Sequence, residues 1–309
     1  MYSFVDAHCD TVVKAYDKCE GMCENSLHID LKRLKEYESP VQVFAIWLDK
    51  KYYNDPFNES IKRINYYHQQ ICANADIIGH VNSFQDIEKN KGDKRISGIL
   101  SIEGGEALEG RIENLYKLYE KGVRAITLTW NYRNHVASGA GEKDGGLTEF
   151  GYTVISEMER LKMLVDVSHL NDRSFLDVSK VAKKPFFASH SNSRKITNVR
   201  RNLTDTQMKI IAKNEGMIGV NLCGLFLNRG IAANIDNVLT HIDHMTKVIG
   251  YDNIGFGFDF DGVTDLPTGI MGVENTKEII KAIKKKYGYA IYKKITEENF
   301  LNYFRRCSE

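Results

Sequence analysis

The sequence predicts an α/β fold of the (β/α)8 TIM-barrel type, with a metal site at the C-terminal ends of the strands. Eight apolar runs of strand length alternate with segments that carry apolar residues at helical spacing. The runs are almost continuously apolar, which is typical of parallel strands covered on both faces. Polar residues that can bind metals follow several of these runs, and in such barrels the chemistry lies at the carboxyl ends of the strands.

Size and composition are those of an ordinary globular protein. The chain has 309 residues, of which 42% are hydrophobic and 27% are charged. Only four prolines occur and no low-complexity segment marks a linker, so we expect residues 1–309 to form a single domain. The 42 basic and 41 acidic residues nearly cancel, which argues against a nucleic-acid-binding surface.

The ends of the chain and its cysteines bear on where the protein works. No signal-type apolar segment precedes the first strand, no run approaches the roughly 18 apolar residues of a membrane span, and residues 305–309 do not resemble a lipid-anchor tail. We expect a cytoplasmic protein that acts on a small substrate, without a membrane partner, and a homodimer is compatible with this picture. The six cysteines show no C-x-x-C pair and no regular spacing, which favours free thiols.

The eight strand candidates follow one another along the whole chain. They are residues 4–7, 41–48, 96–102, 123–129, 163–167, 185–189, 217–222 and 254–258. A doubly wound open sheet is the alternative architecture, but it usually has about five to seven strands and a G-x-G-x-x-G turn after the first. No such turn follows residues 4–7, and Gly104-Gly105 after the third run is too short for a phosphate loop.

Helical patterns fill the intervals between these runs. They cover residues 61–75, 111–120, 150–161, 172–182, 235–249 and 275–287. A further helix begins at the capping box formed by Thr204 and Gln207, and Gly250 is a C-cap for the helix that ends at residue 249. We also expect Thr296 to cap a last helix that runs to residue 304.

Polar and metal-competent side chains gather where the strand candidates end. In chain order they are His8 and Asp10, Glu103, Trp130 and Asn131, His169, His190, Asn221, and Asp259 with Asp261. His8 and Asp10 are two residues apart, so at a strand end they share a face and offer an imidazole nitrogen and a carboxylate oxygen, a pair that suits zinc. Three of the nine histidines fall on this rim, which favours a metal site over scattered structural side chains.

The candidate ligands are too many for one zinc ion with an open position. There are five of them, namely His8, Asp10, Glu103, His169 and His190. A catalytic zinc takes about four ligands including water. Two ions fit if Glu103 bridges them, with the ligands of the first strand on one ion and the two later histidines on the other. Asp259 is then left as an acid/base group, with a loop tether as its alternative role, and we expect Asp261 to be structural.

Together these residues resemble a known family, the membrane dipeptidase (renal dipeptidase) family of zinc peptidases, and in particular its soluble bacterial branch. The matching stretches run almost from end to end: Asp6-Ala7-His8-Cys9-Asp10-Thr11, Ile102-Glu103-Gly104-Gly105, Leu128-Thr129-Trp130-Asn131, Gly145-Gly146-Leu147-Thr148, Leu164-Val165-Asp166-Val167-Ser168-His169-Leu170, Ala188-Ser189-His190-Ser191-Asn192, Arg201-Asn202-Leu203-Thr204-Asp205 and Asp259-Phe260-Asp261-Gly262. Each stretch alone is unspecific, but the set and its order are highly specific.

The resemblance implies a barrel with two zinc ions that hydrolyses dipeptides by a metal-bridging hydroxide. By motif, the five candidate ligands match the ligands of the family, with Glu103 as the bridge. Asp259 matches the carboxylate that handles the proton. Arg201 matches the arginine that holds the C-terminal carboxylate of the substrate, a role that the spacing of the residues does not single out.

The chain departs from the animal enzymes of this family at Trp130. Those enzymes carry a histidine there, near the carbonyl of the substrate. An indole can donate one hydrogen bond or wall the pocket, but it is not a metal ligand. We expect Trp130 to contact the substrate, and His135, five residues further on, is an alternative that could reach the site from its loop.

Two other functional classes compete with a dipeptidase. A deaminase or lactonase of the amidohydrolase type is also a metal-dependent barrel hydrolase, but such enzymes usually begin with H-x-H, and His8-Cys9-Asp10 speaks against this. A non-catalytic metal-binding or scaffold protein would have no use for the spare carboxylate of Asp259 beside an intact ligand set.

Overall fold

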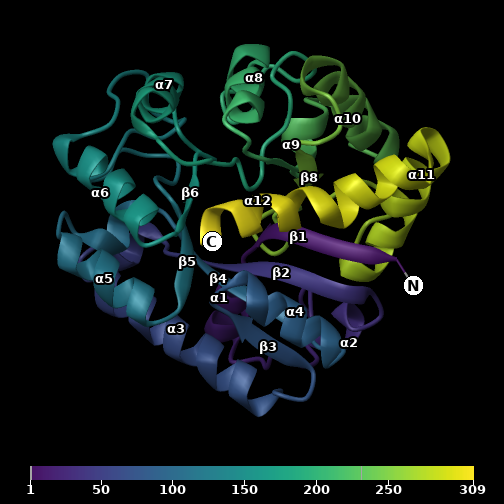
Figure 1. The fold of residues 1–309 in the computed structure, drawn as a ribbon, viewed down its shortest axis with the longest axis horizontal. Helices are drawn as coiled ribbons and strands as arrows, with labels where there is room; N and C mark the ends of the chain where they lie inside the picture. The colour runs from purple at the N-terminus through teal and green to yellow at the C-terminus, as the bar shows by residue number, and fades with distance from the viewer. Residues whose placement is uncertain (1, 231) are drawn as a thin grey trace.

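The fold is a parallel β-barrel surrounded by helices, as the sequence predicts (Figure 1). The structure, a computed structural model, describes residues 2–230 and 232–309. Its strands are β1 (Ser3–Cys9), β2 (Glu38–Trp47), β3 (Ile78–Val81), β4 (Ile96–Glu103), β5 (Val123–Thr127), β6 (Leu164–Asp166), β7 (Ile218–Val220) and β8 (Ile254–Phe256). Every pair of neighbouring strands is parallel, in the order β6-β5-β4-β2-β1-β8-β7, and β3 pairs with β4.

Residues 185–189 close the barrel between β6 and β7. Phe187 forms a parallel bridge with Asp166 of β6, and Ala188 forms one with Ile218 of β7. These contacts are isolated bridges rather than a regular ladder, although the segment lies where the sequence predicts the sixth strand. Together with β1, β2, β4, β5, β6, β7 and β8 it completes the ring.

Twelve α-helices lie in the described part of the chain. They are α1 (Thr11–Lys18), α2 (Leu31–Leu34), α3 (Pro56–Ala73), α4 (Phe84–Gly92), α5 (Ile112–Glu120), α6 (Glu149–Arg160), α7 (Asp172–Val181), α8 (Asp205–Lys213), α9 (Gly224–Leu227), α10 (Ile235–Ile249), α11 (Thr276–Lys293) and α12 (Asn299–Ser308). Short 3-10 turns occur at η1 (Lys50–Tyr52), η2 (Gly105–Leu108) and η3 (Val273–Asn275), and a π-helical turn, η4 (Lys294–Glu298), joins α11 to α12. None of these helices is long and apolar enough to cross a lipid bilayer.

The predicted helix ends are right in two places and wrong in one. The Thr204 hydroxyl accepts a hydrogen bond from the Gln207 backbone, and Gln207 reciprocates, so α8 begins with the predicted capping box. Helix α10 covers the predicted residues 235–249, and Gly250 follows with φ 75°. Thr296 does not cap a helix, because it lies inside the π-helical turn, where its hydroxyl lies 3.1 Å from the Ser3 hydroxyl.

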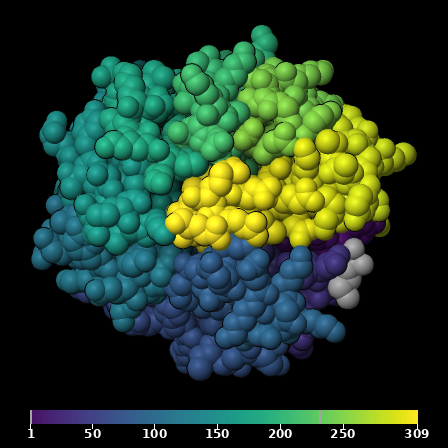
Figure 2. Space-filling model, in the orientation of Figure 1, coloured from purple at the N-terminus to yellow at the C-terminus, as the bar shows by residue number. Residues whose placement is uncertain are grey.

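The interior of the barrel is sealed at the end where the strands begin. Helix α12 crosses the centre of the view in Figure 1, and Figure 2 shows the C-terminal segment covering the middle of that face. The aromatic residues Phe300, Tyr303 and Phe304 of α12 belong to the same buried cluster as Val5 and other inward-facing strand residues. The opposite end of the barrel, where the strands finish, is left for the site.

Candidate metal centre

The end of β1 supplies two buried polar side chains. His8 is the second-last residue of β1, and Asp10 lies between β1 and α1. Asp10 occupies the N-cap position of α1, yet its side chain makes no capping hydrogen bond. Two atoms, Asp10 Oδ1 and His8 Nε2, are buried without a hydrogen-bond partner among the described residues. Leaving a buried polar atom without a partner costs free energy of folding, and a cation bound between these two atoms would remove that cost.

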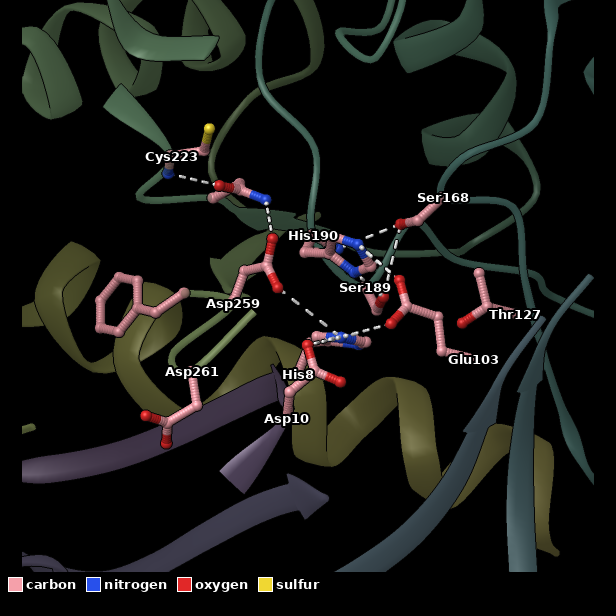
Figure 3. Close-up of polar contacts among 12 residues, drawn as sticks. His8, Asp10, Glu103, Thr127, Ser168, Ser189, His190, Cys223, Asp259 and Asp261 are labelled. Carbon is pink, nitrogen blue, oxygen red and sulfur yellow. Dashed lines mark hydrogen bonds and ion pairs between the residues drawn. The ribbon is translucent and has the colours of Figure 1, made fainter. Parts of the chain in front are cut away.

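Glu103, the last residue of β4, lies between two groups of candidate ligands, and Figure 3 shows its carboxylate beside His8 and His190. Its Oε2 is 3.5 Å from His8 Nε2. Its Oε1 is 2.9 Å from His169 Nε2 and 3.5 Å from His190 Nε2. The two oxygens of one carboxylate therefore face histidines from opposite sides of the barrel mouth.

Three sets of side chains converge closely enough to hold a cation. They are His8, Asp10 and Glu103; Glu103, His169 and His190; and His8, His190 and Asp259. All of these residues are buried. The structure thus brings together all five predicted ligands, and Glu103 is common to the first two sets. Imidazole and carboxylate donors of this kind suit zinc and similar divalent ions.

The two histidines beside Glu103 are oriented by hydrogen bonds to their far nitrogens. Nδ1 of His169 lies 2.9 Å from Oδ1 of Asn131, and Nδ1 of His190 lies 2.7 Å from the Ser189 hydroxyl. Their Nε2 atoms lie 2.9 Å apart and face Glu103. Burial lowers the pKa of His169 to about 4 and that of His190 well below its usual value, so both rings are neutral and can offer a lone pair.

Burial and crowding shift the pKa values of the acidic residues in opposite directions. Burial raises the pKa of Asp10 to about 6 and that of Asp259 to about 8, and the charge of Glu103 adds to both increases. Burial would also raise the pKa of Glu103, but the nearby charge of His8 outweighs it and lowers that pKa. A bound divalent ion would let all three carboxylates ionise together, because its charge inverts this local balance.

Asp259, which follows β8, is held by Asn221 at the end of the neighbouring strand β7. Asn221 donates from Nδ2 to Asp259 Oδ2 at 2.9 Å, while Asp259 Oδ1 lies 3.8 Å from His8 Nε2. The Asn221 backbone is fixed in turn by Asn192 Oδ1 at 3.1 Å. The position of Asn221 after the seventh strand is the only sequence signal for this role.

Asp261 has the structural role that the sequence predicts. Its carboxylate accepts hydrogen bonds from the Thr11 hydroxyl at 2.5 Å and from the His28 backbone at 2.9 Å. Its own backbone N–H donates to His28 Nδ1 at 3.0 Å. These bonds tie the loop before α2 to the β8 end of the barrel. Figure 3 shows the carboxylate turned away from His8 and Glu103.

A cavity of about 320 Å³ opens over the ligand cluster. Trp130 and Arg201 line it, together with Glu103, His169 and Asp259. The Trp130 ring centre lies 5.3 Å from that of Trp47 and 6.3 Å from that of His169, so an aromatic wall stands beside the candidate ligands. His135 is exposed and does not line the cavity, which removes it as the alternative to Trp130.

The guanidinium of Arg201 makes a hydrogen bond through one terminal nitrogen but not through Nε. Its terminal nitrogen donates to the His190 carbonyl at 3.2 Å, and its guanidinium carbon lies 5.4 Å from the centre of the Phe226 ring. Its Nε–H is buried and has no acceptor within the described part of the chain. Burial lowers the pKa of Arg201, but a guanidinium stays charged. A cationic donor without an acceptor fits an anionic group of a ligand.

A (β/α)8 barrel with histidines and carboxylates that converge at the strand ends is typical of metal-dependent hydrolases. The chain belongs to the membrane dipeptidase family, peptidase family M19, whose model matches residues 2–309. Its activity is therefore that of a metal-dependent dipeptidase, and the deaminase or lactonase alternative is not supported.

Several relatives and solved structures are similar to the chain over most of its length. An uncharacterized protein from the pqqA 5′ region of Klebsiella pneumoniae is 32% identical over 259 residues, which cover 80% of this chain and 95% of that protein. An uncharacterized dipeptidase of Schizosaccharomyces pombe is 31% identical over 83% of this chain and 67% of its own. The crystal structure of a dipeptidase AC of family M19 superposes with a TM-score of 0.92 at 25% identity, covering 99% of both chains.

A further similar structure shares the fold. A metallopeptidase from Rhodobacter sphaeroides, solved with a phosphinate mimic of the dipeptide L-Ala-D-Ala, superposes with a TM-score of 0.92 at 24% identity. It covers 99% of each chain.

Proposed function

We propose that the protein binds two zinc ions at this site and hydrolyses dipeptides that have a free C-terminal carboxylate. The observation that carries the proposal is the position of Glu103, whose two oxygens face separate sets of ligands. His8 and Asp10 would hold one ion, His169 and His190 the other, and Glu103 would bridge them. Two ions at such a site would polarise the scissile carbonyl and lower the pKa of water.

Asp259 would move the proton. Its buried carboxylate lies at the cavity and is steadied by Asn221, so one oxygen remains free for the substrate side. In the reaction this oxygen takes a proton from the attacking water and returns it to the leaving amine, which is general base and then general acid catalysis. The carboxylate needs no change of position between the two transfers.

Arg201 and Trp130 would place the substrate. The unpaired Nε–H of Arg201 supports a role in binding the C-terminal carboxylate, since a guanidinium and a carboxylate match in a bidentate way. Trp130 would wall the opposite part of the cavity against the first residue of the dipeptide. Holding both ends orients the peptide bond over the ligand cluster, which lowers the entropic part of the barrier.

Metal analysis tests the two-ion proposal. Elemental analysis of zinc-saturated protein should find two ions per chain, and Glu103→Ala should lose at least one of them together with dipeptidase activity. Glu106→Gln is the matched control, because Glu106 follows three residues later outside the ligand sets and should keep both ions. One ion per chain at saturation, still retained by Glu103→Ala, would exclude the bridged site.

The cytoplasmic location stays a prediction of the sequence, and a homodimer stays compatible with it. Sedimentation of the purified chain distinguishes a monomer from a homodimer. Neither is required by the proposed chemistry, because every residue assigned above comes from one chain.

A further inference from the structure

A buried carboxylate that is not among the candidate ligands lies under the second set of them. Asp166, the last residue of β6, is only 2% exposed and accepts four hydrogen bonds. Its Oδ1 accepts from the backbone N–H groups of Ser168 and Ser189, both at 2.9 Å. Its Oδ2 accepts from the hydroxyls of Thr127 and Ser189, both at 2.6 Å.

The direction of these bonds fixes the proton of the Ser189 hydroxyl. An ionised carboxylate can only accept hydrogen bonds, and a hydroxyl has a single proton to give. Ser189 gives that proton to Asp166 Oδ2. Toward His190 Nδ1, which lies 2.7 Å from the same hydroxyl, Ser189 can therefore only accept.

The proton between Ser189 and His190 must then lie on Nδ1 of the imidazole. A neutral imidazole carries one N–H, so Nε2 keeps its lone pair, and Nε2 is the atom that lies 3.5 Å from Glu103 Oε1. Ser168 fits the same order, because its hydroxyl accepts from the His190 backbone at 3.1 Å and is free to donate to Ser189 at 3.3 Å. Figure 3 shows Ser168 and Ser189 beside His190.

We propose that Asp166 is a positioning residue that acts through Ser189 to hold His190 in the Nδ1–H tautomer, with Nε2 bare toward Glu103. The relay thereby sets the metal affinity of the site formed by Glu103, His169 and His190. This second statement rests on the proposed function, whereas the tautomer itself does not. Carboxylates that orient a ligating histidine usually contact it directly, and here a serine lies between.

The Asp166→Asn variant tests the relay most directly, because the new amide can adopt only one orientation of its oxygen and its NH2 group. The two backbone N–H groups at Oδ1 demand an acceptor, so the amide oxygen must stay there and the NH2 group must face the two hydroxyls. The NH2 group then donates to Ser189, which turns its own proton toward His190 Nδ1. The variant should shift His190 to the Nε2–H tautomer while its size and shape barely change.

Long-range ¹H–¹⁵N spectra of the metal-free full chain report the tautomer directly. Wild type should show His190 with its proton on Nδ1, and Asp166→Asn should show it on Nε2. In a competition with a chromophoric chelator, the variant should hold the zinc ion at Glu103, His169 and His190 roughly 10- to 100-fold less tightly than wild type does. Ser189→Ala, which breaks the relay without inverting it, should lose the single tautomer, and Ser189→Thr should restore it.

Thr127→Val is the matched control, since it removes another hydrogen bond from Asp166 Oδ2 but none from the path to His190. It should keep the Nδ1–H tautomer and the zinc affinity of wild type. An unchanged tautomer in both Asp166→Asn and Ser189→Ala, or an equal loss of affinity in Thr127→Val, would overturn the relay. The expected tautomers without zinc binding in the wild type would instead overturn the proposed function and leave the relay intact.

Discussion

Two residues at the centre of the site have a backbone conformation that non-glycine residues rarely adopt. His169 and Asp259 lie in the left-handed region, with φ of 69° and 63°. Such a conformation costs about 1–3 kcal/mol per residue and persists where the surroundings hold it in place. Here the Asn131 and Asn221 side chains fix the two side chains that these backbones present to the cavity. The strain is therefore located at residues to which the chemistry is assigned.

The Asp259→Asn variant separates a proton-transfer role from a ligand role. The amide keeps the shape of the side chain but cannot accept a proton, so we expect kcat to fall roughly 10²- to 10⁴-fold. Both metal ions should remain, as elemental analysis would show. Asp261→Asn is the control, because Asp261 also lines the cavity but is engaged by Thr11 and His28. Its kcat should stay close to that of wild type.

Loss of a metal ion from Asp259→Asn would contradict this assignment. Asp259 lies within reach of His8 and His190 in one of the three convergent sets, so the outcome is a real alternative. In that case Asp259 would be a ligand, and the proton acceptor would have to be sought elsewhere in the cavity.

The Arg201→Ala variant tests how the substrate is held. Wild type should hydrolyse a dipeptide much faster than the same dipeptide with a C-terminal amide, because charge-assisted hydrogen bonds need the carboxylate. The variant should lose roughly 10- to 100-fold in kcat/KM on the free acid and little on the amide. Arg201→Lys should recover little of the loss, since a point charge does not replace a planar fork.

The neighbouring arginine provides the matched control. Arg200 is exposed, and its side chain donates only a long 3.4 Å hydrogen bond to the Glu142 carbonyl. Arg200→Ala should keep the preference for the free acid. Equal rates on acid and amide in the wild type would show that the carboxylate is not recognised at all.

At this scale the sequence predicts the candidate ligands better than it predicts the residues that support them. The convergence of the candidate ligands His8, Asp10, Glu103, His169 and His190 could be predicted because each follows a strand candidate and carries metal-binding chemistry. The proposed relay through Asp166 could not be predicted, since the partners of Asp166 are Thr127, Ser168 and Ser189. No spacing in the chain reveals which of their hydroxyls donates. Arg201 required the family resemblance, because its loop position has no periodic signal.

At the scale of elements, the irregular sixth segment of the barrel depends on two glycines in its neighbours. A Cβ added at Gly219 of β7 would lie 1.9 Å from the Ser189 carbonyl oxygen, and one added at Gly257 would lie 1.6 Å from it. Both positions must therefore lack a side chain if residues 185–189 are to lie against β7 and β8. The next residue of that segment is His190, so this packing also positions a candidate ligand.

Gly257→Ala should disturb both stability and the site. The added methyl group meets backbone atoms rather than a flexible side chain, and overpacking of this kind costs typically 1–3 kcal/mol or more. Thermal unfolding should show a lower Tm, and zinc should bind more weakly because the Ser189–His190 backbone must move. Gly92→Ala is the control, since nothing lies within 4 Å of its added Cβ. A Gly257→Ala variant with wild-type Tm and zinc affinity would contradict this account.

The elements that could be predicted are those with a long periodic pattern. Residues 235–249 repeat their apolar face over four turns, and the helix has those bounds. Strand β3 was not predicted, because Ile78–Val81 contains a glycine and a histidine and is too short for a pattern. Thr296 was wrongly predicted to be a cap, because its hydrogen bond is made to Ser3, at the other end of the chain, rather than to its own helix.

At the scale of the whole molecule, the two ends of the barrel divide stability from chemistry. Helix α12 fills the end where the strands begin, and its Tyr303 ring packs 5.0 Å from that of Phe187 in the sixth segment. The carboxyl ends of the strands hold the polar residues instead. The short segment of residues 185–190 therefore contacts α12 through Phe187 and supplies the candidate ligand His190.

Acid should destabilise the whole fold through a histidine that lies outside the site. His241 of α10 is fully buried, accepts a hydrogen bond from the Ser193 backbone at 3.0 Å, and has Nε2 3.0 Å from the Leu227 carbonyl. Burial lowers its pKa to about 4, and the nearby His244 adds to the decrease, while the bond to Leu227 opposes it. The ring is therefore neutral in the folded protein over the range in which the unfolded chain binds a proton.

The sign of the effect follows from that difference in protons bound. Between the unfolded pKa of 6.5 and the folded pKa of about 4, the unfolded state holds more protons, so stability rises with pH and is lost as pH falls. At about pH 5 this one group should lower the free energy of unfolding by about 2 kcal/mol relative to about pH 7.5.

The His241→Gln variant tests this effect, because glutamine cannot be protonated. Between about pH 7.5 and about pH 5, its free energy of unfolding should fall by about 2 kcal/mol less than that of wild type. Urea unfolding of both metal-free proteins at the two pH values measures the difference, and the comparison at the higher pH gives the cost of the substitution itself. Equal losses in wild type and variant would show that His241 is not the group that the acid attacks.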